Sequence, residues 1–179
     1  PLCDEYLMKE IEQRSYPLGL NLCSICNFVQ LNFVIPPEII YKNYIYVTTS
    51  SQGLEKHFQK YVSDVTALLK LNSKKLVVDI GSNDGTLLGF FKKNGHNVIG
   101  IEPASETAKK ANQKNINTLD KFFDMQVSQH IVDTYGHAEI ITINNLFANI
   151  VDLNVFMKAI DKLLDKNGVF IIESSYLYK

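Results

Sequence analysis

The sequence predicts an α/β fold built on a doubly wound parallel sheet, and two features of the chain support that prediction. Short apolar runs such as 76–80 and 169–173 lack the alternation of a half-exposed strand, so they are typical of strands buried on both faces. Segments with apolar residues at helical spacing separate these runs. Ligands of such sheets bind beyond the carboxyl ends of the strands, and the candidate site residues should lie there.

The composition is that of an ordinary soluble globular protein. The 179 residues are 46% hydrophobic and 21% charged, and 18 basic against 19 acidic residues leave a formal net charge of −1. The length suits one domain with a small accessory part. The charges form no basic face suited to nucleic acid, and no apolar run reaches the roughly 20 residues that span a bilayer. Three cysteines, an odd number without framework spacing, predict a protein of the reducing cytoplasm.

Residues 1–53 lack the strand–helix alternation and are predicted to form a small, β-rich N-terminal module. Cys23 and Cys26 make a C-x-x-C pair between two strand-like runs, 18–22 and 28–31. This arrangement is typical of one half of a zinc ribbon, in which the cysteines lie at the tip of a hairpin. A redox-active pair would instead open a helix, which the following residues do not favour.

A complete zinc site of this kind needs four thiolates, and Cys3 is the only further cysteine. The C-x-x-C pair is therefore either half of a site whose other ligands precede Pro1, or simply two packed thiols. We expect the pair alone to bind zinc weakly or not at all.

A short helix should open at 36–38, and a tyrosine-rich stretch follows at 41–51. This stretch holds three tyrosines and four hydroxyl residues in eleven positions. If it is extended, Tyr44 and Tyr46 lie on the same face, where they could line a polar substrate. An ordinary strand edge packed with tyrosine explains the composition equally well.

A connecting helix is predicted at 54–70, docked on the sheet ahead of its first strand. Its apolar residues recur at helical spacing: Phe58, Tyr61, Val62, Val65, Leu68 and Leu69. His57 lies on the flank of this helix, where a histidine is more often a surface residue than a base.

The core at 71–179 begins with a strand that runs into a turn containing Gly81 and Gly85. The pattern D-I-G-S-N-D-G lacks the middle glycine of a dinucleotide fingerprint, and Asp84 stands where the next helix begins. A carboxylate there repels a diphosphate by ~1 kcal/mol or more and attracts an ammonium or sulfonium group. The spacing therefore favours S-adenosylmethionine. Alternatively, Asp79 and Asp84 only cap the turn and the helix.

A second acidic residue, Glu102, ends the next apolar run, 21 residues after Gly81. In nucleotide-binding units a carboxylate about 20 positions on accepts hydrogen bonds from the ribose hydroxyls. Pro103 would then lie in the first turn of the following helix, where its missing N–H costs nothing. Either motif alone is a weak signal, but the two in this order predict a cofactor site.

The strand–helix alternation continues along the rest of the chain. We expect helices at 104–114, 124–134 and 153–164, the last closed by Gly168, and strands at 116–119, 139–144 and 169–173. Asn144 and Asn145 end the fourth strand on the ligand side of the sheet, where their amides can bond neutral polar groups or cap a turn. Five strands are most of a class I, Rossmann-like methyltransferase core, so we expect a core truncated after its fifth strand.

Together these stretches resemble the sugar C-methyltransferases that act on nucleotide-linked deoxysugars. The resemblance covers the end of that family's zinc-binding N-terminal domain and most of its methyltransferase domain. The matching stretches keep the family's order: 16–18, 23–31, 44–51, 78–85, 100–104, 144–149 and 170–173.

The resemblance implies a role for each motif. Cys23 and Cys26 would be zinc ligands, and Tyr46 or Tyr44 would face the substrate as the candidate catalytic residue. The candidate cofactor contacts are Asp79, Gly81, Ser82, Asn83, Asp84, Gly85, Glu102, Pro103, Asn144 and Asn145. Two departures concern catalysis, since the family usually has histidine at the position of Asn149 and its Asp-Glu-His motif would fall beyond residue 179.

The implied function is S-adenosylmethionine-dependent C-methylation of a nucleotide-linked keto-deoxysugar. This reaction needs a carbon nucleophile, most easily an enolate formed by removing a proton next to the carbonyl. Two other functions fit the same core: O- or N-methylation of a small metabolite, and a cofactor-binding scaffold without turnover. The missing glycine disfavours an NAD-dependent reductase. We expect residues 1–179 to bind cofactor without turning over substrate.

Overall fold

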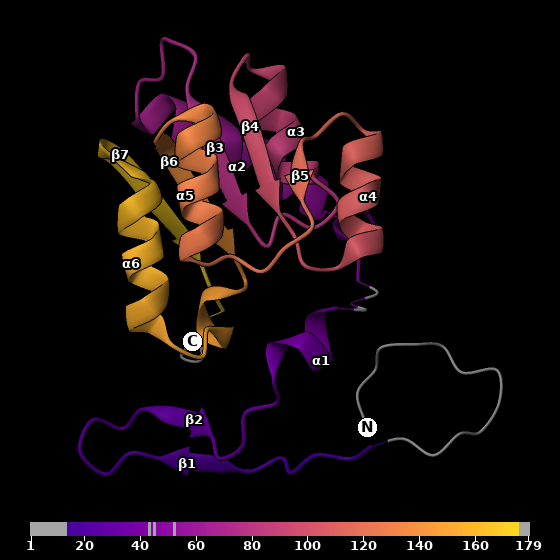
Figure 1. Cartoon of the computed structure of the whole chain (residues 1–179), viewed down its shortest axis with the longest axis vertical. Coiled ribbons are helices and arrows are strands. Elements are labelled where there is room, and N and C mark those ends of the chain that lie inside the picture. Colours follow the sequence, from indigo (N-terminus) through magenta and orange to yellow (C-terminus); the bar gives the residue numbers. More distant parts are fainter. Residues whose placement is uncertain (1–13, 43, 45, 52, 176–179) are drawn as a thin grey trace, which may run out of the picture. The chain divides into compact units, whose positions relative to one another are not determined.

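The computed structural model describes residues 14–42, 44, 46–51 and 53–175 (Figure 1). The chain divides into two compact units, Pro1–Ile45 and Tyr46–Lys179, which are described separately. Among the described residues, no helix is both long and apolar enough to cross a membrane.

The first unit contains the predicted hairpin and the predicted short helix. Strands β1 (Leu20–Leu22) and β2 (Val29–Leu31) pair antiparallel, and the C-x-x-C pair lies in the turn between them. The N–H of Cys23 donates to the carbonyl of Phe28 at 2.9 Å, which closes the turn. Helix α1 (Pro37–Tyr41) begins at a proline, whose fixed φ suits the first position of a helix.

The second unit is built on a five-stranded parallel sheet, as predicted. Its strands are β3 (Leu76–Ile80), β4 (Asn97–Ile101), β5 (Thr118–Leu119), β6 (Ala138–Asn144) and β7 (Leu164–Glu173). They lie in the order β5-β4-β3-β6-β7. The chain extends the sheet in one direction from β3 to β5 and then returns to add β6 and β7 on the other side of β3. The switch point between β3 and β6 is where ligands bind in folds of this kind.

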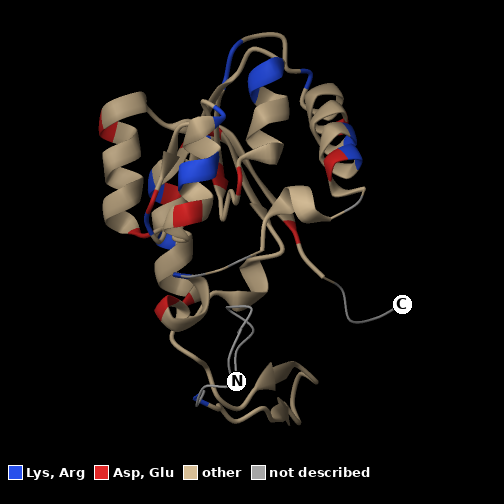
Figure 2. Ribbon diagram, turned by 90° about the vertical axis from the view of Figure 1, so that its right-hand side faces the viewer, with Lys and Arg blue, Asp and Glu red and all other residues tan. Residues whose placement is uncertain are grey.

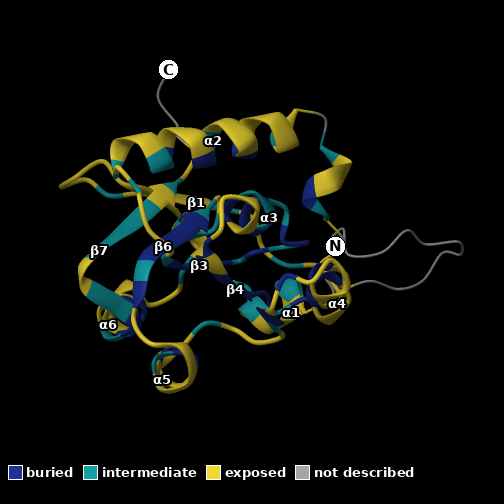
Figure 3. Cartoon of the chain, turned by 90° about the horizontal axis from the view of Figure 1, so that it is seen from above, coloured by how far each residue is buried: buried dark blue, intermediate teal, exposed yellow. Residues whose placement is uncertain are grey.

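Helices cover both faces of this sheet. They are α2 (Leu54–Leu68), α3 (Thr86–Lys93), α4 (Ser105–Gln113), α5 (Met125–Tyr135) and α6 (Leu153–Leu163). Seen from above, α2 and α3 lie on one side of the strands and α5 and α6 on the other (Figure 3). Both acidic and basic residues are distributed over these helices (Figure 2). The doubly wound prediction is confirmed.

The first strand shows why its apolar run is unbroken. Val77 packs in a cluster with Val62 of α2 and Phe91 of α3, whereas Val78, the next residue, packs with Ile131 of α5 on the opposite face. Successive side chains of a strand point to opposite faces, so a strand covered on both sides needs an apolar residue at each position.

The tyrosine-rich stretch does not form the strand edge that was one of its two interpretations. Its described residues contain a 3-10 turn, η1 (Thr48–Ser50), and no strand. A side chain of the β3–α3 segment accepts a hydrogen bond from the backbone of Thr48 at the start of this turn, as described below. Tyr44 belongs to the first unit and Tyr46 to the second, so no shared face can be assigned to them.

Two further details of the predicted helices are wrong. Helix α6 ends at Leu163 because Leu164 is already extended, and Gly168 lies inside β7 instead of closing the helix. A Cβ at Gly168 would lie 3.0 Å from the carbonyl oxygen of Ala138, so this glycine allows a close approach between strands. Pro103 precedes Ala104, the N-cap of α4, and is not in the first turn of the helix.

Candidate functional site

The candidate cofactor residues lie where the carboxyl ends of β3, β4 and β6 meet at one edge of the sheet. Asp79 is level with Gly100 of β4 and Thr142 of β6. The turn after β3 is bonded to the end of β4, since the N–H groups of Gly81 and Ser82 donate to the carbonyl of Ile101 at 2.8 and 3.1 Å.

Two glycines of the turn are required by its shape. Gly81 has a φ of +74°, and a Cβ there would lie 2.8 Å from Leu146 Cδ2. Gly85, the N-cap of α3, has a φ of +75°, and a Cβ there would lie 3.1 Å from three side-chain atoms of Ile116. Glycine adopts left-handed backbone at the least cost and has no Cβ to clash, so another residue at either position would be strained.

Asp79 is a buried carboxylate next to the switch point. It is 3% exposed, and its Oδ1 accepts hydrogen bonds from Thr142 Oγ1 at 2.7 Å and Asn144 Nδ2 at 3.4 Å. Burial raises the pKa of Asp79 to about 7; the bond from Thr142 opposes this effect and the charge of Glu102 adds to it. A cation beside Asp79 would favour its ionised form, and an anion would not.

Glu102 joins the two turns that border the edge. Its Oε2 accepts the N–H of Asn83 at 3.0 Å and its Oε1 accepts the N–H of Ala104 at 2.9 Å. Burial raises its pKa, although both N–H groups oppose the effect. An ionised carboxylate has about four acceptor positions, so Glu102 keeps capacity for two hydroxyl donors.

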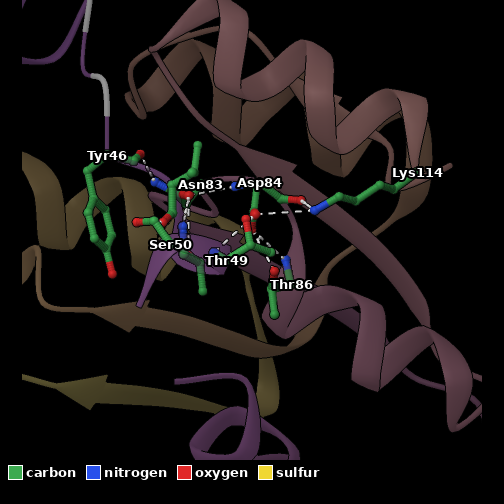
Figure 4. A network of polar contacts seen from close by, with 9 residues as sticks. Tyr46, Thr49, Ser50, Asn83, Asp84, Thr86 and Lys114 are labelled. Atoms are coloured by element: carbon green, nitrogen blue, oxygen red, sulfur yellow. Dashed lines mark hydrogen bonds and ion pairs between the residues drawn. The ribbon is translucent and has the colours of Figure 1, made fainter. Parts of the chain in front are cut away.

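Asn83 clasps the tyrosine-bearing segment to the turn (Figure 4). Its Oδ1 accepts the N–H of Thr48 at 2.8 Å and the Oγ1 of Thr48 at 3.2 Å, while its Nδ2 donates to the carbonyl of Tyr46 at 3.0 Å. We call residues 46–51 the strap. The turn and the tyrosine-rich stretch are well separated in the sequence. The structure brings the turn and Tyr46 together.

Asp84 has protein partners for its charge. It is 1% exposed, and it accepts Thr86 Oγ1 at 2.6 Å, the N–H of Thr49 at 3.4 Å and Lys114 Nζ at 3.2 Å. Burial raises its pKa, but these hydrogen bonds and the Lys114 charge outweigh burial and lower it overall. Its acceptance of the Thr86 N–H at 3.3 Å fits the capping alternative, so we assign Asp84 to the scaffold of the site.

Tyr46 lies on the strap, and its hydroxyl is 2.8 Å from Ser51 Oγ. The residue is 37% exposed, so part of Tyr46 is accessible. Tyr44 is in the other unit, so only Tyr46 can be placed relative to the candidate cofactor residues.

Buried polar atoms without a partner mark the same edge. Among the described residues, neither Asn144 Oδ1 nor Ser82 Oγ has a hydrogen-bond partner. Asn145 has a φ of 54° and donates its N–H to the carbonyl of Glu173 at 2.7 Å. Buried polar groups are normally paired, so the two orphan atoms suggest a polar ligand at this edge.

Several contributors carry no strong sequence signal. Thr142, Thr48 and Lys114 act through contacts that span 30 or more residues.

A cavity of about 310 Å³ lies beyond β5. Leu119, one of its lining residues, accepts a hydrogen bond from the N–H of Glu102. The cavity is lined by Leu119, Lys121, Phe122, Asp124, Gln126, Val127 and His130.

The cysteine pair supplies two thiols at the hairpin turn. Cys26 is exposed and Cys23 partly so, and the amides of Cys26 and Ile25 lower the pKa of the Cys23 thiol. Such amide donors favour a thiolate, the form that binds metal. No group of three or more potential metal ligands occurs within residues 14–42 or the other described parts, so the pair does not by itself complete a zinc site.

Comparison with known proteins identifies relatives of this chain. A family model described as a methyltransferase domain matches residues 54–177. The C-methyltransferase NovU of Streptomyces niveus is 30% identical over 162 residues, which cover 90% of this chain and 39% of NovU. The chain therefore spans about two fifths of the length of that relative.

Solved structures share the fold at low sequence identity. PH0226 of Pyrococcus horikoshii has a TM-score of 0.57 and 15% identity, over 74% of this chain and 59% of its own. A SAM-dependent methyltransferase of Geobacter sulfurreducens, solved with S-adenosyl-L-homocysteine, has a TM-score of 0.53 and 14% identity, over 78% and 55%.

Proposed function

Since the chain belongs to the family of methyltransferase domains and has their class I, Rossmann-like fold, we propose that it binds S-adenosylmethionine and serves methyl transfer to a carbon of a nucleotide-linked keto-deoxysugar. The observation that carries the cofactor assignment is the pair of buried carboxylates, Asp79 and Glu102, at the switch point. The acceptor assignment is supported by the similarity to a C-methyltransferase and by the motif order given above.

Each part of the cofactor has a matching group at this edge. Glu102 accepts the two ribose hydroxyls, because its carboxylate retains acceptor capacity beyond its two N–H partners. Asp79 faces the ammonium group, and Ser82 and Asn144 supply polar atoms that have no hydrogen-bond partner in the described part of the chain. The cavity beyond β5 receives the adenine ring, with Phe122 and Leu119 as apolar contacts. Gly81, Asn83 and Gly85 shape the turn, and Pro103 and Asn145 hold the adjoining loops.

When bound, S-adenosylmethionine supplies an electrophilic methyl group on a sulfonium. The protein must then align an acceptor carbon with that group and stabilise the charge that develops on the acceptor. The strap brings Tyr46 to the border of the cofactor turn, so we assign Tyr46 an acceptor-facing role. Asn144 and Asn145 remain proposed cofactor contacts, since their neutral amides can bond polar groups without adding charge.

The remaining assignments concern the zinc ligands and the small-molecule partner of the protein. We propose that Cys23 and Cys26 are two zinc ligands, supported by their hairpin position and by the amide donors at Cys23. Two thiolates fill half of a tetrahedral site, so further ligands must come from outside the described residues. The proposed partner is a small nucleotide-linked sugar in the cytoplasm.

Calorimetric titration with S-adenosylmethionine and with NAD tests the cofactor assignment. We expect S-adenosylmethionine to bind more tightly, and equal or tighter binding of NAD would contradict the proposal. Because residues 1–179 alone are expected not to turn over substrate, a longer protein that contains them is then incubated with a nucleoside-diphosphate-linked 3-keto-deoxysugar and isotope-labelled cofactor to test the acceptor. A labelled C-methyl product supports C-methylation, whereas a labelled O- or N-methyl product would replace it with the alternative.

A further inference from the structure

A histidine and a glutamate far apart in the sequence meet at the same edge of the sheet. His57 of α2 and Glu173 at the end of β7 are 116 positions apart, and His57 Nε2 lies 2.7 Å from Glu173 Oε2. Their side chains are 48% and 30% exposed, so both partners remain accessible. The expectation of an ordinary surface histidine does not account for this pairing.

The pair borders the residues assigned above to cofactor and acceptor. Glu173 is level with Asn144 on the neighbouring strand, and its carbonyl accepts the N–H of Asn145 at 2.7 Å. Tyr61 lies one helical turn after His57, with ring centroids 6.4 Å apart. Its buried hydroxyl has no hydrogen-bond partner among the described residues. Burial, followed by the negative charges of Asp79 and Glu173, raises the pKa of Tyr61.

Another ion pair on the same helix shows what a purely structural contact looks like. Lys60 and Asp64 are four residues apart on α2, with side chains 75% and 63% exposed, and such solvated pairs contribute little to stability. The His57–Glu173 pair instead joins the helix to the carboxyl end of a strand, on the ligand side of the sheet.

We propose that His57 is an acid–base residue of the acceptor site and that Glu173 is its positioning residue, an inference that rests on the proposed function. Donation from Nε2–H to Glu173 fixes the tautomer and leaves the Nδ1 lone pair free to accept a proton. His57 Nδ1 takes the proton next to the acceptor's keto group: the C–H bond breaks, an N–H bond forms, and the electron pair stays on the acceptor as an enolate. The enolate carbon then bonds the methyl group as the methyl–sulfur bond breaks, and His57 returns its proton to solvent.

Proton exchange tests this assignment without requiring methyl transfer. The chain, saturated with S-adenosyl-L-homocysteine, is mixed in D₂O with a nucleoside-diphosphate-linked 3-keto-deoxysugar, and loss of the adjacent C–H signal is followed by NMR. We expect H57Q to slow enzyme-dependent exchange by roughly 10²–10⁴-fold, the usual contribution of a general base, and E173Q to slow it less. Both variants should keep wild-type affinity for S-adenosyl-L-homocysteine.

Matched controls are H137Q, at an exposed histidine ahead of β6, and D64N, which removes the other ion pair of α2. Both should exchange at the wild-type rate. Wild-type exchange by H57Q, or a wild-type chain that binds the sugar without exchanging its proton, would overturn the assignment. If the sugar does not bind at all, the acceptor in the proposed function is wrong.

The tautomer of the His57 ring tests the proposed role of His57 separately from the identity of the acceptor. Ring ¹⁵N chemical shifts at neutral pH should show Nε2–H with an unprotonated Nδ1, and E173Q should reduce this preference. A His57 ring protonated on Nδ1, or one unaffected by E173Q, would overturn the proposal independently of any sugar.

Discussion

The carboxylates on the two sides of the switch point differ in exposure and in hydrogen-bond partners. On the β3–β4 side, Asp79 and Glu102 are 3% and 5% exposed, and Glu102 is held by backbone N–H groups. On the β6–β7 side, Glu173 is partly exposed and pairs with a side chain from a helix. Backbone donors and burial give fixed geometry, whereas a solvated side-chain pair can exchange protons. The first side is suited to holding a ligand and the second to proton transfer.

Glu102→Ala tests the β3–β4 side and should have the largest effect on cofactor binding. The ribose hydroxyls would lose a charged acceptor, so we expect S-adenosylmethionine to bind about 1–3 kcal/mol more weakly by calorimetry. Glu106→Ala, at an exposed position in the first turn of α4, is the matched control and should bind normally. Thermal unfolding must show that the variant is folded, and an unchanged affinity in a folded variant would refute the role of Glu102.

Asp79→Asn should remove the pH dependence of the free energy of unfolding that comes from the buried carboxylate on the β3–β4 side. The folded-state pKa of Asp79 is raised to about 7 from 3.8, so its protonated form adds stability that is complete below about pH 4 and lost as the pH rises through about 7. Urea midpoints between these limits should therefore fall less steeply with pH in the variant. Asp133→Asn, on the exposed face of α5, should leave the slope unchanged. Equal slopes for wild type and Asp79→Asn would contradict the raised pKa.

Asn83→Ala tests whether the Asn83 side chain holds the strap against the β3–α3 turn. Loss of the bonds to Thr48 and Tyr46 should reduce the free energy of unfolding by about 1–2 kcal/mol and increase hydrogen exchange at the Thr48 amide. Asn94→Ala, at an exposed helix end, is the control. If exchange at Thr48 does not change, the clasp contributes nothing to holding the strap.

The double variant Cys23→Ser, Cys26→Ser should have the smallest effect on the sheet edge. The cysteines belong to the other compact unit, so affinity for S-adenosylmethionine should match that of the wild type. Zinc content, measured in a longer protein that includes the upstream residues, should fall. Zinc retained in that double variant would exclude the two thiols as ligands.

Local patterns predicted most of the fold, because burial on both faces of a sheet leaves a direct record in sequence. The run at Val77 and Val78, and the helical spacing of Phe58 and Val62, required no knowledge of distant contacts. The turn glycines and Glu102 were found because the chemistry of a strand-end ligand site fixes their spacing. The end of α6 was placed at Gly168 although Leu164 is already extended and paired with Ala138 of β6, a contact between distant segments that leaves no local sequence pattern.

The other site contacts join segments with no local relation to one another. Asn83 reaches Thr48 across 35 positions, and His57 reaches Glu173 across 116. Neither pair creates a periodic pattern, and each residue alone has a common surface explanation. Asp84 shows the converse, since its sequence position suggested a ligand contact while Lys114 and Thr86 give it a structural role.

The clasp by Asn83 has a consequence for how such a chain can diversify. The residues proposed to hold the cofactor lie on the parallel strands and in the turns after them, whereas the strap reaches the same edge from the preceding segment, 46–51, and is bonded to the turn mainly by one amide side chain. Changes in the strap can therefore alter acceptor preference while Glu102 and Gly81 stay in place. Mutational change in the strap is then largely independent of change in the strands that hold the cofactor, and one scaffold can serve a series of different acceptors.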